Sequence, residues 1–331
     1  MQAIAIIGNG RIGGIIASFA RSAGYPARLS AGPGTNVQTI EGADIIVLAV
    51  PWTRLDAVAE QCAPVLAGKI LIDATNPYSE VYEPVGPAVP YTSGGMQNAA
   101  RFPGARVVKA FNTLPSDDLA ARGTSEPRAR VALALSGDDA DAKAEVADLI
   151  LACSYEPVDL GALERASRQE PGGPYYARVL APFEMRNGEI AWRFVTDVLA
   201  RGDMQAFDEL VADSIVVNSG ISPLAPMAGK EAFREGLGAL GAFSRGELHV
   251  QDVLPAGDRV TVRYVAYADH TGPQLGVPPT GKRIKMWEIR LMRIVESKIV
   301  EDFVADINYD WPWLVAPRYR DAWLRQMAEH G

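Results

Sequence analysis

A short stretch at the start of the chain decides its fold: Ala3-Ile4-Ala5-Ile6-Ile7, followed directly by Gly8-Asn9-Gly10-Arg11-Ile12-Gly13. The apolar run predicts a buried strand, and the residues after the glycines predict a helix. Glycines at this spacing permit a tight turn, leave room for a pyrophosphate at the second glycine, and let the helix pack closely on the strand. The amides at the start of such a helix favour phosphate. The stretch therefore predicts a dinucleotide-binding turn.

Apolar runs and helix-like stretches alternate through the first half of the chain. Runs such as Ile45-Ile46-Val47-Leu48 are typical of strands covered on both faces in a parallel sheet. We expect strands at Ala3–Ile7, Ala27–Ser30, Ile45–Val50, Ile70–Asp73, Val107–Phe111 and Val131–Leu135. We expect helices at Ile12–Ala23, Leu55–Leu66 and Ala140–Leu151. This alternation predicts a doubly wound α/β Rossmann domain over residues 1–182.

The pattern changes in the second half. A Pro/Gly-rich stretch at residues 170–174 precedes the change, and we place the linker close to Pro182–Gly188. Helices are then predicted at Ile190–Ala200, Met204–Val211 (capped by Asp203), Lys230–Phe243 and Arg318–His330. Strands are predicted at Leu248–Leu254, Arg259–Asp269, Ile284–Val295 and Lys298–Asp306. Helices followed by long antiparallel strands indicate an α+β cone over residues 188–331.

Composition narrows the class of protein. A chain of 331 residues has room for two domains, and a formal net charge of −8 argues against nucleic acid or an anionic membrane as partner. Cys62 and Cys153 lie far apart, outside any CxxC pattern, which favours buried free thiols of a reducing compartment over a disulfide. The first apolar run is too short for a signal peptide or membrane span, so we expect a cytoplasmic protein.

The end of the second predicted strand bears on the choice of cofactor. NAD enzymes usually place an acidic residue there, which binds the ribose hydroxyls and repels a 2′-phosphate. The segment Arg28-Leu29-Ser30-Ala31-Gly32 has no acid. Ser30 is able to bind a phosphate, with charge from Arg11 or Arg28, although both arginines are equally consistent with a solvated surface. The segment favours NADPH and does not exclude NADH.

Three strand-end motifs then carry a resemblance. They are Ala43-Asp44-Ile45-Ile46-Val47-Leu48-Ala49-Val50-Pro51-Trp52, Ile72-Asp73-Ala74-Thr75-Asn76-Pro77 and Val107-Val108-Lys109-Ala110-Phe111-Asn112-Thr113. Over roughly its first half, the chain resembles the NADP-dependent deazaflavin-coenzyme oxidoreductases. The resemblance implies that Ala49, Val50, Pro51, Asn76 and Pro77 line the cofactor cleft, with Phe111 and Asn112 beyond them at the substrate. Where that family often has a Ser-Arg pair, Ser30 is followed here by Ala31.

The first half offers few groups for acid–base chemistry. The three histidines, His249, His270 and His330, all lie in the second half. Reduction of a simple ketone benefits from a positioned proton donor, and the candidates are Lys109, Tyr78 and Tyr91. A flavin-like or quinone ring needs such a donor less, because the developing charge is delocalised. We therefore expect the hydride acceptor to be a conjugated ring.

The second half carries a different resemblance, on Ala268-Asp269-His270-Thr271-Gly272, Gly276-Val277-Pro278-Pro279-Thr280-Gly281-Lys282 and the run from Leu291 to Ile299. From about Asn187 onward, the chain resembles the SnoaL-like polyketide cyclases, which have the cone-shaped fold of the nuclear-transport-factor superfamily. The resemblance implies an apolar cavity in which an acidic residue, often with a histidine, enolises a carbonyl compound without a metal. Relatives of this fold act as hydroxylases.

Candidate residues of the second site follow from strand alternation. In the segment 300–306, Asp302, Val304 and Asp306 share one face. A base next to a carbonyl needs a pKa raised by apolar surroundings. The resemblance favours Asp306 as this base, with Asp302 second, although the spacing is one residue shorter than is usual; the alternative is a solvated acidic edge strand.

Other residues complete the predicted second site. His270 matches the cavity histidine of the family, with a purely structural role as the alternative. Asn218 is able to hydrogen-bond a substrate carbonyl, or to cap a strand end. The substrate surface is predicted to include Trp287, and the segment with Trp311 and Trp313 is able to roof a cavity for a flat ligand.

These features lead to one hypothesis and two rivals. The hypothesis is a bifunctional tailoring enzyme of aromatic polyketide (antibiotic-type) biosynthesis: NADPH reduces a quinone-like ring, and the second domain cyclises, rearranges or hydroxylates the product. One rival is an NADPH-dependent flavin or deazaflavin reductase whose second domain serves dimerisation. The other is a non-catalytic NADPH-sensing module. We expect a small aromatic ligand, no metal, and a homo-oligomer, most simply a dimer.

Overall fold

The computed structural model describes residues 2–88, 91–219, 226–273 and 278–306. The chain divides into two compact units, Met1–Met185 and Arg186–Gly331, and each is described by itself. The predicted helix at Arg318–His330 and the predicted roof residues Trp311 and Trp313 lie outside the described residues. Among the described residues, no helix combines the length and the apolar character needed to cross a bilayer.

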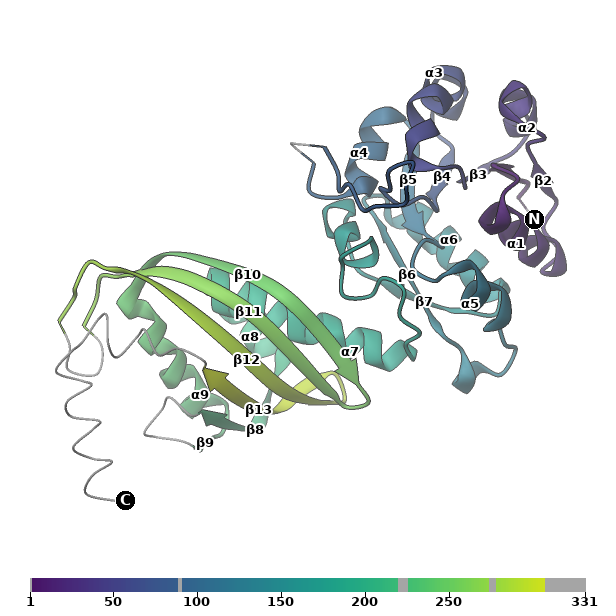
Figure 1. Cartoon of the computed structure of the whole chain (residues 1–331). Coiled ribbons are helices and arrows are strands. Elements are labelled where there is room, and N and C mark those ends of the chain that lie inside the picture. The colour runs from purple at the N-terminus through teal and green to yellow at the C-terminus, as the bar shows by residue number, and fades with distance from the viewer. Residues whose placement is uncertain (1, 89–90, 220–225, 274–277, 307–331) are drawn as a thin grey trace. The chain divides into compact units, whose positions relative to one another are not determined.

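The first unit contains the predicted alternation of strands and helices (Figure 1). Its strands are β1 (Ile4–Ile7), β2 (Ala27–Leu29), β3 (Ile45–Leu48), β4 (Ile70–Asp73), β5 (Arg106–Ala110), β6 (Ala132–Gly137) and β7 (Glu156–Asp159). Its α-helices are α1 (Arg11–Ser22), α2 (Asn36–Ile40), α3 (Leu55–Leu66), α4 (Gly94–Arg101), α5 (Ser116–Ala121) and α6 (Ala140–Ala152). The Rossmann-like architecture predicted from the sequence is confirmed.

The strands form one seven-stranded sheet in the order β2-β1-β3-β4-β5-β6-β7. Neighbouring strands are parallel except at the β5–β6 pair, which is antiparallel. The order of the strands reverses at β1, because β2 lies on one side of it and β3 lies on the other. In open α/β sheets a ligand crevice forms at such a reversal, outside the carboxyl ends of the strands. The fold therefore places the crevice beyond β1 and β3.

Both faces of this sheet are covered. Along β1, Ile4 and Ile6 belong to one apolar core, and Ala5 and Ile7 belong to the other. The first core includes residues of α1, α5 and α6, and the second includes residues of α2 and α3. Because both faces of each central strand are buried, the strand sequences read as unbroken apolar runs.

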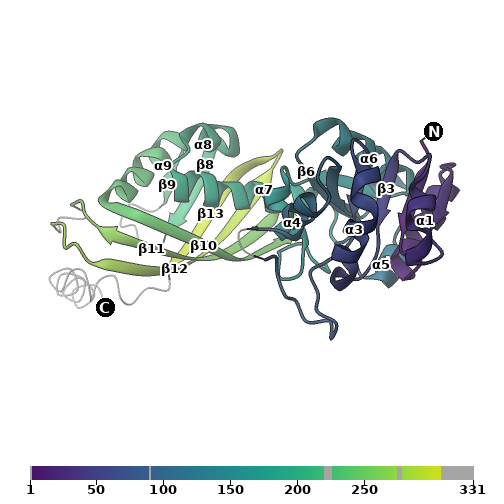
Figure 2. The same cartoon turned by 90° about the horizontal axis from the view of Figure 1, so that it is seen from above.

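The second unit combines helices with one curved sheet (Figure 2). Its strands are β8 (Val211–Ser219), β9 (Met227–Ala228), β10 (Phe243–Ala256), β11 (Arg259–His270), β12 (Arg283–Val295) and β13 (Lys298–Asp306). The helix α7 (Pro182–Arg193) begins four residues before this unit and continues into it. It is followed by a π-helical continuation (Phe194–Leu199), α8 (Met204–Leu210) and α9 (Lys230–Leu237). The sheet order is β10-β11-β12-β13-β8-β9, which confirms the predicted α+β architecture.

Two predictions about the start of this unit had different outcomes. The stretch expected to be a linker, Pro182–Gly188, is instead helical and forms the first turns of α7. A proline at the first position of a helix costs little, because its missing amide hydrogen would have no partner there. The predicted cap of α8 is confirmed: Asp203 accepts hydrogen bonds from the backbone amides of Gln205 and Ala206.

Candidate functional site

The glycine turn of the first unit is shaped by close packing at two of its three glycines. Gly8 has a φ of +114°, and a Cβ there would lie 2.2 Å from the Ala49 carbonyl oxygen. A Cβ on Gly13 would lie 2.1 Å from the carbonyl oxygen of Gly8. A Cβ on Gly10, in contrast, would meet no atom within 4 Å. The second glycine therefore faces open space at the N-terminus of α1, where a pyrophosphate has room to approach the backbone.

The residues after β3 lie beside this turn. A Cβ on Gly8 would also lie 3.1 Å from Val50 Cγ1, and the Ala49 amide donates a hydrogen bond to the carbonyl oxygen of Ile7. Pro51 follows them and is exposed. The structure thus brings Ala49, Val50 and the glycine turn together at the carboxyl ends of β1 and β3, where the sequence placed the cofactor cleft.

Other residues of the turn point in several directions. Asn9 Nδ2 lies 3.5 Å from the carbonyl oxygen of Ala31. Arg11 is exposed and forms an ion pair with Asp117, which is also exposed. Ile12 is partly buried against the first core. An exposed pair of this kind contributes little to stability.

Ser30 does not present a free hydroxyl. The side chain is buried, and its Oγ lies 2.6 Å from Asn36 Oδ1 and 2.8 Å from the Gly32 carbonyl oxygen. The hydroxyl therefore closes the turn that follows β2. Arg28 hydrogen-bonds the backbone carbonyl of Glu41. Of the polar side chains predicted for a 2′-phosphate, Arg11 and Arg28 are both exposed, and Arg11 is the one that belongs to the glycine turn.

Asn76 and Asn112 form a reciprocal pair at the ends of β4 and β5. Asn76 Nδ2 donates to the Asn112 carbonyl oxygen at 2.9 Å, and Asn112 Nδ2 donates to Asn76 Oδ1 at 2.9 Å. Asn112 is buried and also bonds Gln169, whereas Asn76 is partly exposed beside the buried Pro77. Asn76 thus remains a cleft residue. Asn112, predicted at the substrate, instead positions Asn76 from beneath.

The prediction of Phe111 as a substrate residue is wrong. Its side chain is fully buried in the first core, and its backbone has a φ of +61°. A left-handed conformation is uncommon for a bulky residue, and here it turns the ring inward. At this position the strand-end motif contributes a core residue, and the side chain of Phe111 is not accessible to a ligand.

A buried polar network that the sequence did not reveal lies under the same edge. Lys109 Nζ is 2.9 Å from Asp73 Oδ2, 3.4 Å from Glu170 Oε1 and 2.7 Å from the Thr75 carbonyl oxygen. Glu170 also accepts hydrogen bonds from the amides of Gly94 and Gly95, the first residues of α4. Lys109 is fully buried, so it cannot meet a substrate as the predicted proton donor.

Tyr78 and Tyr91, the other predicted donors, are both partly buried. Tyr78 donates a hydrogen bond to the hydroxyl of Tyr176 at 3.1 Å. Burial, followed by the contact with Tyr78, raises the pKa of Tyr176 well above its usual value. The hydroxyl of Tyr176 therefore stays protonated near neutral pH.

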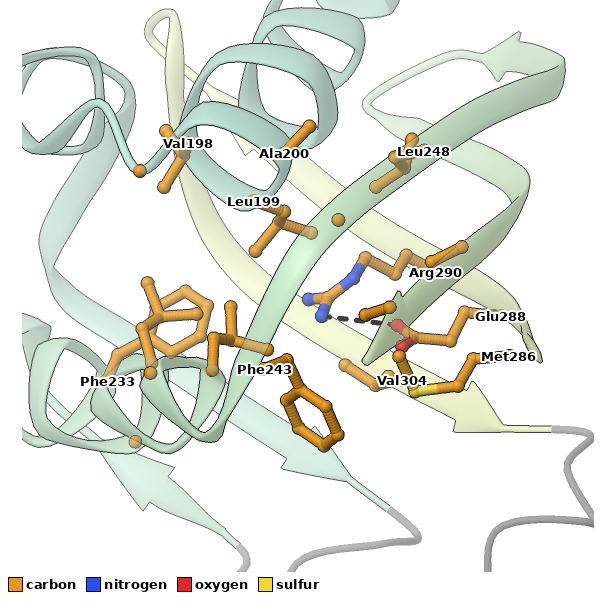
Figure 3. Close-up of a pocket in the computed structure, with 18 of the residues that line it drawn as sticks. Val198, Leu199, Ala200, Phe233, Phe243, Leu248, Met286, Glu288, Arg290 and Val304 are labelled. Atoms are coloured by element: carbon orange, nitrogen blue, oxygen red, sulfur yellow. Dashed lines mark hydrogen bonds and ion pairs between the residues drawn. The ribbon is translucent and has the colours of Figure 1, made fainter. Parts of the chain in front are cut away.

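The second unit contains a cavity of about 990 Å³ (Figure 3). Its walls are mostly apolar. They include Val198 and Leu199 of the π-helical segment, Phe233 of α9, Phe243 and Leu248 of β10, Met286 of β12 and Val304 of β13. A largely apolar recess of this volume is typical of a site for a small organic molecule.

Polar groups gather at one side of this cavity, on β11 and β12 (Figure 3). The Tyr264 hydroxyl donates a hydrogen bond to Glu288 Oε2, and it accepts one from Arg290 Nε at 3.0 Å. Arg290 Nη2 lies 3.5 Å from Glu288 Oε2. Burial raises the pKa of Tyr264 far above its ordinary value; Glu288 adds to this effect and Arg290 opposes it. We refer to Tyr264, Glu288 and Arg290 as the cavity triad.

Asp302, the second predicted base, lies behind this triad. It is fully buried and bonded to Arg290 Nη1, and it is not part of the cavity lining. Burial raises the pKa of Asp302 above its ordinary value, and the charge of Arg290 limits the rise. The structure therefore brings Asp302 to the site as a support for Arg290, away from a substrate.

The remaining predicted residues are spread around the unit. The backbone of Asp306 ends β13 opposite Glu288, and its side chain lies outside the described residues. His270 is buried at the end of β11, where its Nδ1 lies 3.1 Å from Thr280 Oγ1, and it does not line the cavity. Asn218 and Trp287 do not line the cavity either, because they alternate with the lining residues Val217, Met286 and Glu288 along their strands.

A metal site would require a cluster of side chains that could bind the ion. Within the ranges given above, no three His, Cys, Asp or Glu side chains come together in a way that could hold a metal ion. The polar groups at the cavity are tied to one another by hydrogen bonds.

Comparison with known protein families agrees with the division of the chain into two units. Residues 189–305 match the model of the SnoaL-like polyketide cyclases, and residues 26–77 match that of the coenzyme F420-dependent NADP oxidoreductases.

Individual relatives match one part of the chain or the other. A metalloreductase, STEAP3 of Rattus norvegicus, is 30% identical over 136 residues, which cover 40% of this chain and 25% of the relative. Nogalonic acid methyl ester cyclase of Streptomyces nogalater is 33% identical over 86 residues, covering 25% of this chain and 60% of the cyclase. The crystal structure of a hypothetical protein from Sinorhizobium meliloti is 32% identical and covers 55% of this chain and 96% of its own, with a TM-score of 0.48.

The chain thus spans only part of the length of the curated relatives that it matches. Both resemblances predicted from sequence motifs are confirmed. The chain joins a Rossmann-like unit, of which residues 26–77 are similar to the coenzyme F420-dependent NADP oxidoreductases, to a unit that is similar to the SnoaL-like polyketide cyclases over residues 189–305.

Proposed function

We propose that the first unit binds NADPH and transfers its hydride to a quinone-like ring. The open space at Gly10 and the amides of α1 support binding of the pyrophosphate. The absence of an acidic residue at the end of β2, together with the exposed Arg11, favours NADPH over NADH. The fully buried Lys109 offers no proton to a substrate, and a conjugated ring needs none from the protein in order to accept hydride.

The second unit, in this proposal, acts on the same class of compound after reduction. The observation that carries this part is the apolar cavity of about 990 Å³ with the cavity triad at one side. Such a site binds a flat aromatic carbonyl compound and moves protons on it, as cyclisation, rearrangement and hydroxylation all require. The whole chain would then be a bifunctional tailoring enzyme of aromatic polyketides.

Stopped-flow oxidation of NADPH tests the redox part. Simple naphthoquinones and anthraquinones should accelerate the loss of NADPH absorbance, and free flavin should do so less. The variant Gly10→Glu should lose dinucleotide binding and keep its fold, because its new side chain enters open space. Binding retained by this variant would contradict the placement of the cofactor.

A flavin or deazaflavin reductase is the second candidate. It is favoured by the match of residues 26–77 to a family of coenzyme F420-dependent enzymes. In that case the second unit would have a structural role, such as dimerisation. Rapid NADPH oxidation with deazaflavin or flavin, and none with any quinone, would support this candidate over the first.

A further inference from the structure

We propose that Glu288 is the catalytic base of the SnoaL-like unit, and that its substrate is a flat aromatic compound with a carbon acid between two carbonyl groups. This inference rests on the proposed function of the second unit and specifies its chemistry. It assigns the base to a residue of β12 in place of Asp302, which does not line the cavity. The side chain of Asp306, the other residue expected from the sequence, lies outside the described residues.

Position distinguishes Glu288 from the other carboxylates. Among the described residues, the carboxylates that line the cavity are those of Glu235, Glu247 and Glu288. The side chain of Glu247 is 60% exposed and pairs with Arg283, and Glu235 lies on the exposed side of α9. The side chain of Glu288 is 13% exposed and stands among apolar walls. A ligand in the cavity therefore displaces water more completely at Glu288 than at the other two carboxylates.

The hydrogen bonds of Glu288 leave one oxygen for a substrate. Its Oε2 accepts from Tyr264 and lies 3.5 Å from Arg290. Within the described part of the chain, no hydrogen bond or ion pair involves its Oε1. Tyr264 and Arg290 thus fix the plane of the carboxylate, and its second oxygen is able to face a bound ligand. This is the arrangement of an oriented base.

Arg290 supplies the positive charge that enolisation needs. It is buried in the cavity wall, 5.7 Å from the Phe194 ring centroid, and Asp302 binds its Nη1 from behind. Burial opposes its charged form, but the adjacent Tyr264, Asp302 and Glu288 outweigh burial and keep the pKa of Arg290 above its ordinary value. A guanidinium in such a dry site stabilises a developing oxyanion strongly. Asp302 is a positioning residue, which acts through Arg290.

The proposed step balances as a proton transfer. Glu288 Oε1 takes the proton from the carbon between the two carbonyl groups, and the electrons of the C–H bond form a C=C bond. One carbonyl oxygen becomes an enolate beside Arg290. The proton then returns from Glu288 to carbon. Alternatively, the enolate carbon attacks a further carbonyl group elsewhere on the substrate, a C–C bond forms as the π electrons of that C=O bond move to its oxygen, and Glu288 gives the proton to the resulting alkoxide. A second carbonyl is needed because it spreads the enolate charge and makes the C–H acidic enough for a carboxylate.

Deuterium exchange tests the base without a need for the natural substrate. The probe is a tetralone carboxylic acid methyl ester, a two-ring β-keto ester, incubated in D₂O with the full chain and followed by proton NMR. The wild-type protein should accelerate exchange at the central carbon. Glu288→Gln keeps the shape and the hydrogen-bond acceptor but removes the base, so its rate should fall at least about 100-fold. Glu288→Asp should retain an intermediate rate.

Glu301→Gln is the matched control, since Glu301 lies on the outer face of β13 in an exposed pair with Arg259. It should exchange at the wild-type rate, and thermal unfolding should show that all variants are folded. Asp302→Asn should lower the kcat of exchange and leave KM nearly unchanged, because Arg290, released from Asp302, is no longer held where the enolate oxygen forms. An unchanged kcat would overturn the positioning role of Asp302.

The outcomes separate this inference from the function on which it rests. Equal exchange rates in wild type and Glu288→Gln overturn the assignment of Glu288, while the proposed function of the unit stands. A wild-type rate no faster than that in buffer alone overturns the acid–base function of the cavity, and the role of Glu288 with it.

Discussion

At the scale of single residues, adjacent glycines of α1 differ sharply in what they tolerate. A Cβ on Gly13 would lie 2.1 Å from the carbonyl oxygen of Gly8, whereas a Cβ on Gly14 would meet nothing within 4 Å. We predict that Gly13→Ala lowers the free energy of unfolding by about 2 kcal/mol or more, because the helix must move off the strand. Gly14→Ala should raise it by about 0.5 to 1 kcal/mol through reduced chain entropy.

Thermal unfolding followed by circular dichroism compares these variants directly. The expected order of melting temperatures, from highest to lowest, is Gly14→Ala, then wild type, then Gly13→Ala. Equal melting temperatures for the two variants would show that the close approach of α1 to β1 does not constrain the turn as the structure indicates.

The two cysteines should be inert in the folded chain. Cys62 and Cys153 are free and buried. Burial raises the pKa of Cys153 to about 12 and raises that of Cys62 as well. The thiolate is the reactive form, so almost none is present at about pH 8. We predict no rapid reaction with Ellman's reagent in buffer and reaction of both thiols in guanidinium; fast labelling of the native protein would refute this.

The sequence predicted a site residue well when that residue acts together with its neighbours in the chain, and poorly when it acts together with residues of other strands. The glycine turn was predictable, because its function follows from adjacent residues. The cavity triad was not predictable, because β12 has charged residues on both of its faces. Lys285 and Arg293 lie on the outer face, so the sequence does not show which face, theirs or that of Met286, Glu288 and Arg290, lines a cavity. One pattern in the sequence could have indicated the triad. The acidic Glu288 and the basic Arg290 occupy alternate positions of the strand, and the apolar Met292, which is buried, follows them on the same face.

At the scale of elements, the start of α8 depends on one side chain. Asp203 Oδ1 accepts hydrogen bonds of 3.0 Å from the amides of Gln205 and Ala206. The helix buries Phe207 in the core of the second unit. We predict that Asp203→Ala lowers the free energy of unfolding of this unit by about 1 kcal/mol, whereas Asp203→Asn, which keeps the acceptor, changes it little. Urea unfolding measures both, and equal losses would contradict a capping role.

Elements escaped prediction where long-range contacts define them. The strand β8 begins at Val211, directly after α8, with no glycine or proline to mark the change. The helix α4 begins with Gly94 and Gly95, which disfavour helix, and the carboxylate of Glu170, distant in sequence, binds both of their amides. Strands such as β1 and β4 were predictable because their burial on both faces is written in the local sequence.

At the scale of the whole molecule, the chain links two units that each have a core of their own. The first unit has apolar cores on the two faces of its sheet, and the second has one between its helices and its curved sheet. In the proposed function, the link keeps a reduced and labile product at high effective concentration near the second site. This requires that each unit bind its ligand independently.

Calorimetry tests this independence. We predict that NADPH at about 100 times its Kd stabilises the first unit by about 2.7 kcal/mol and moves only its transition upward, because a ligand stabilises the unit that binds it. The two-ring β-keto ester used for deuterium exchange is not a quinone, and it should move only the transition of the second unit, which contains the apolar cavity. In Gly10→Glu, the shift with NADPH should vanish and the shift with the β-keto ester should remain. If NADPH instead moves both transitions together, the units are coupled, and the second site responds directly to the state of the cofactor.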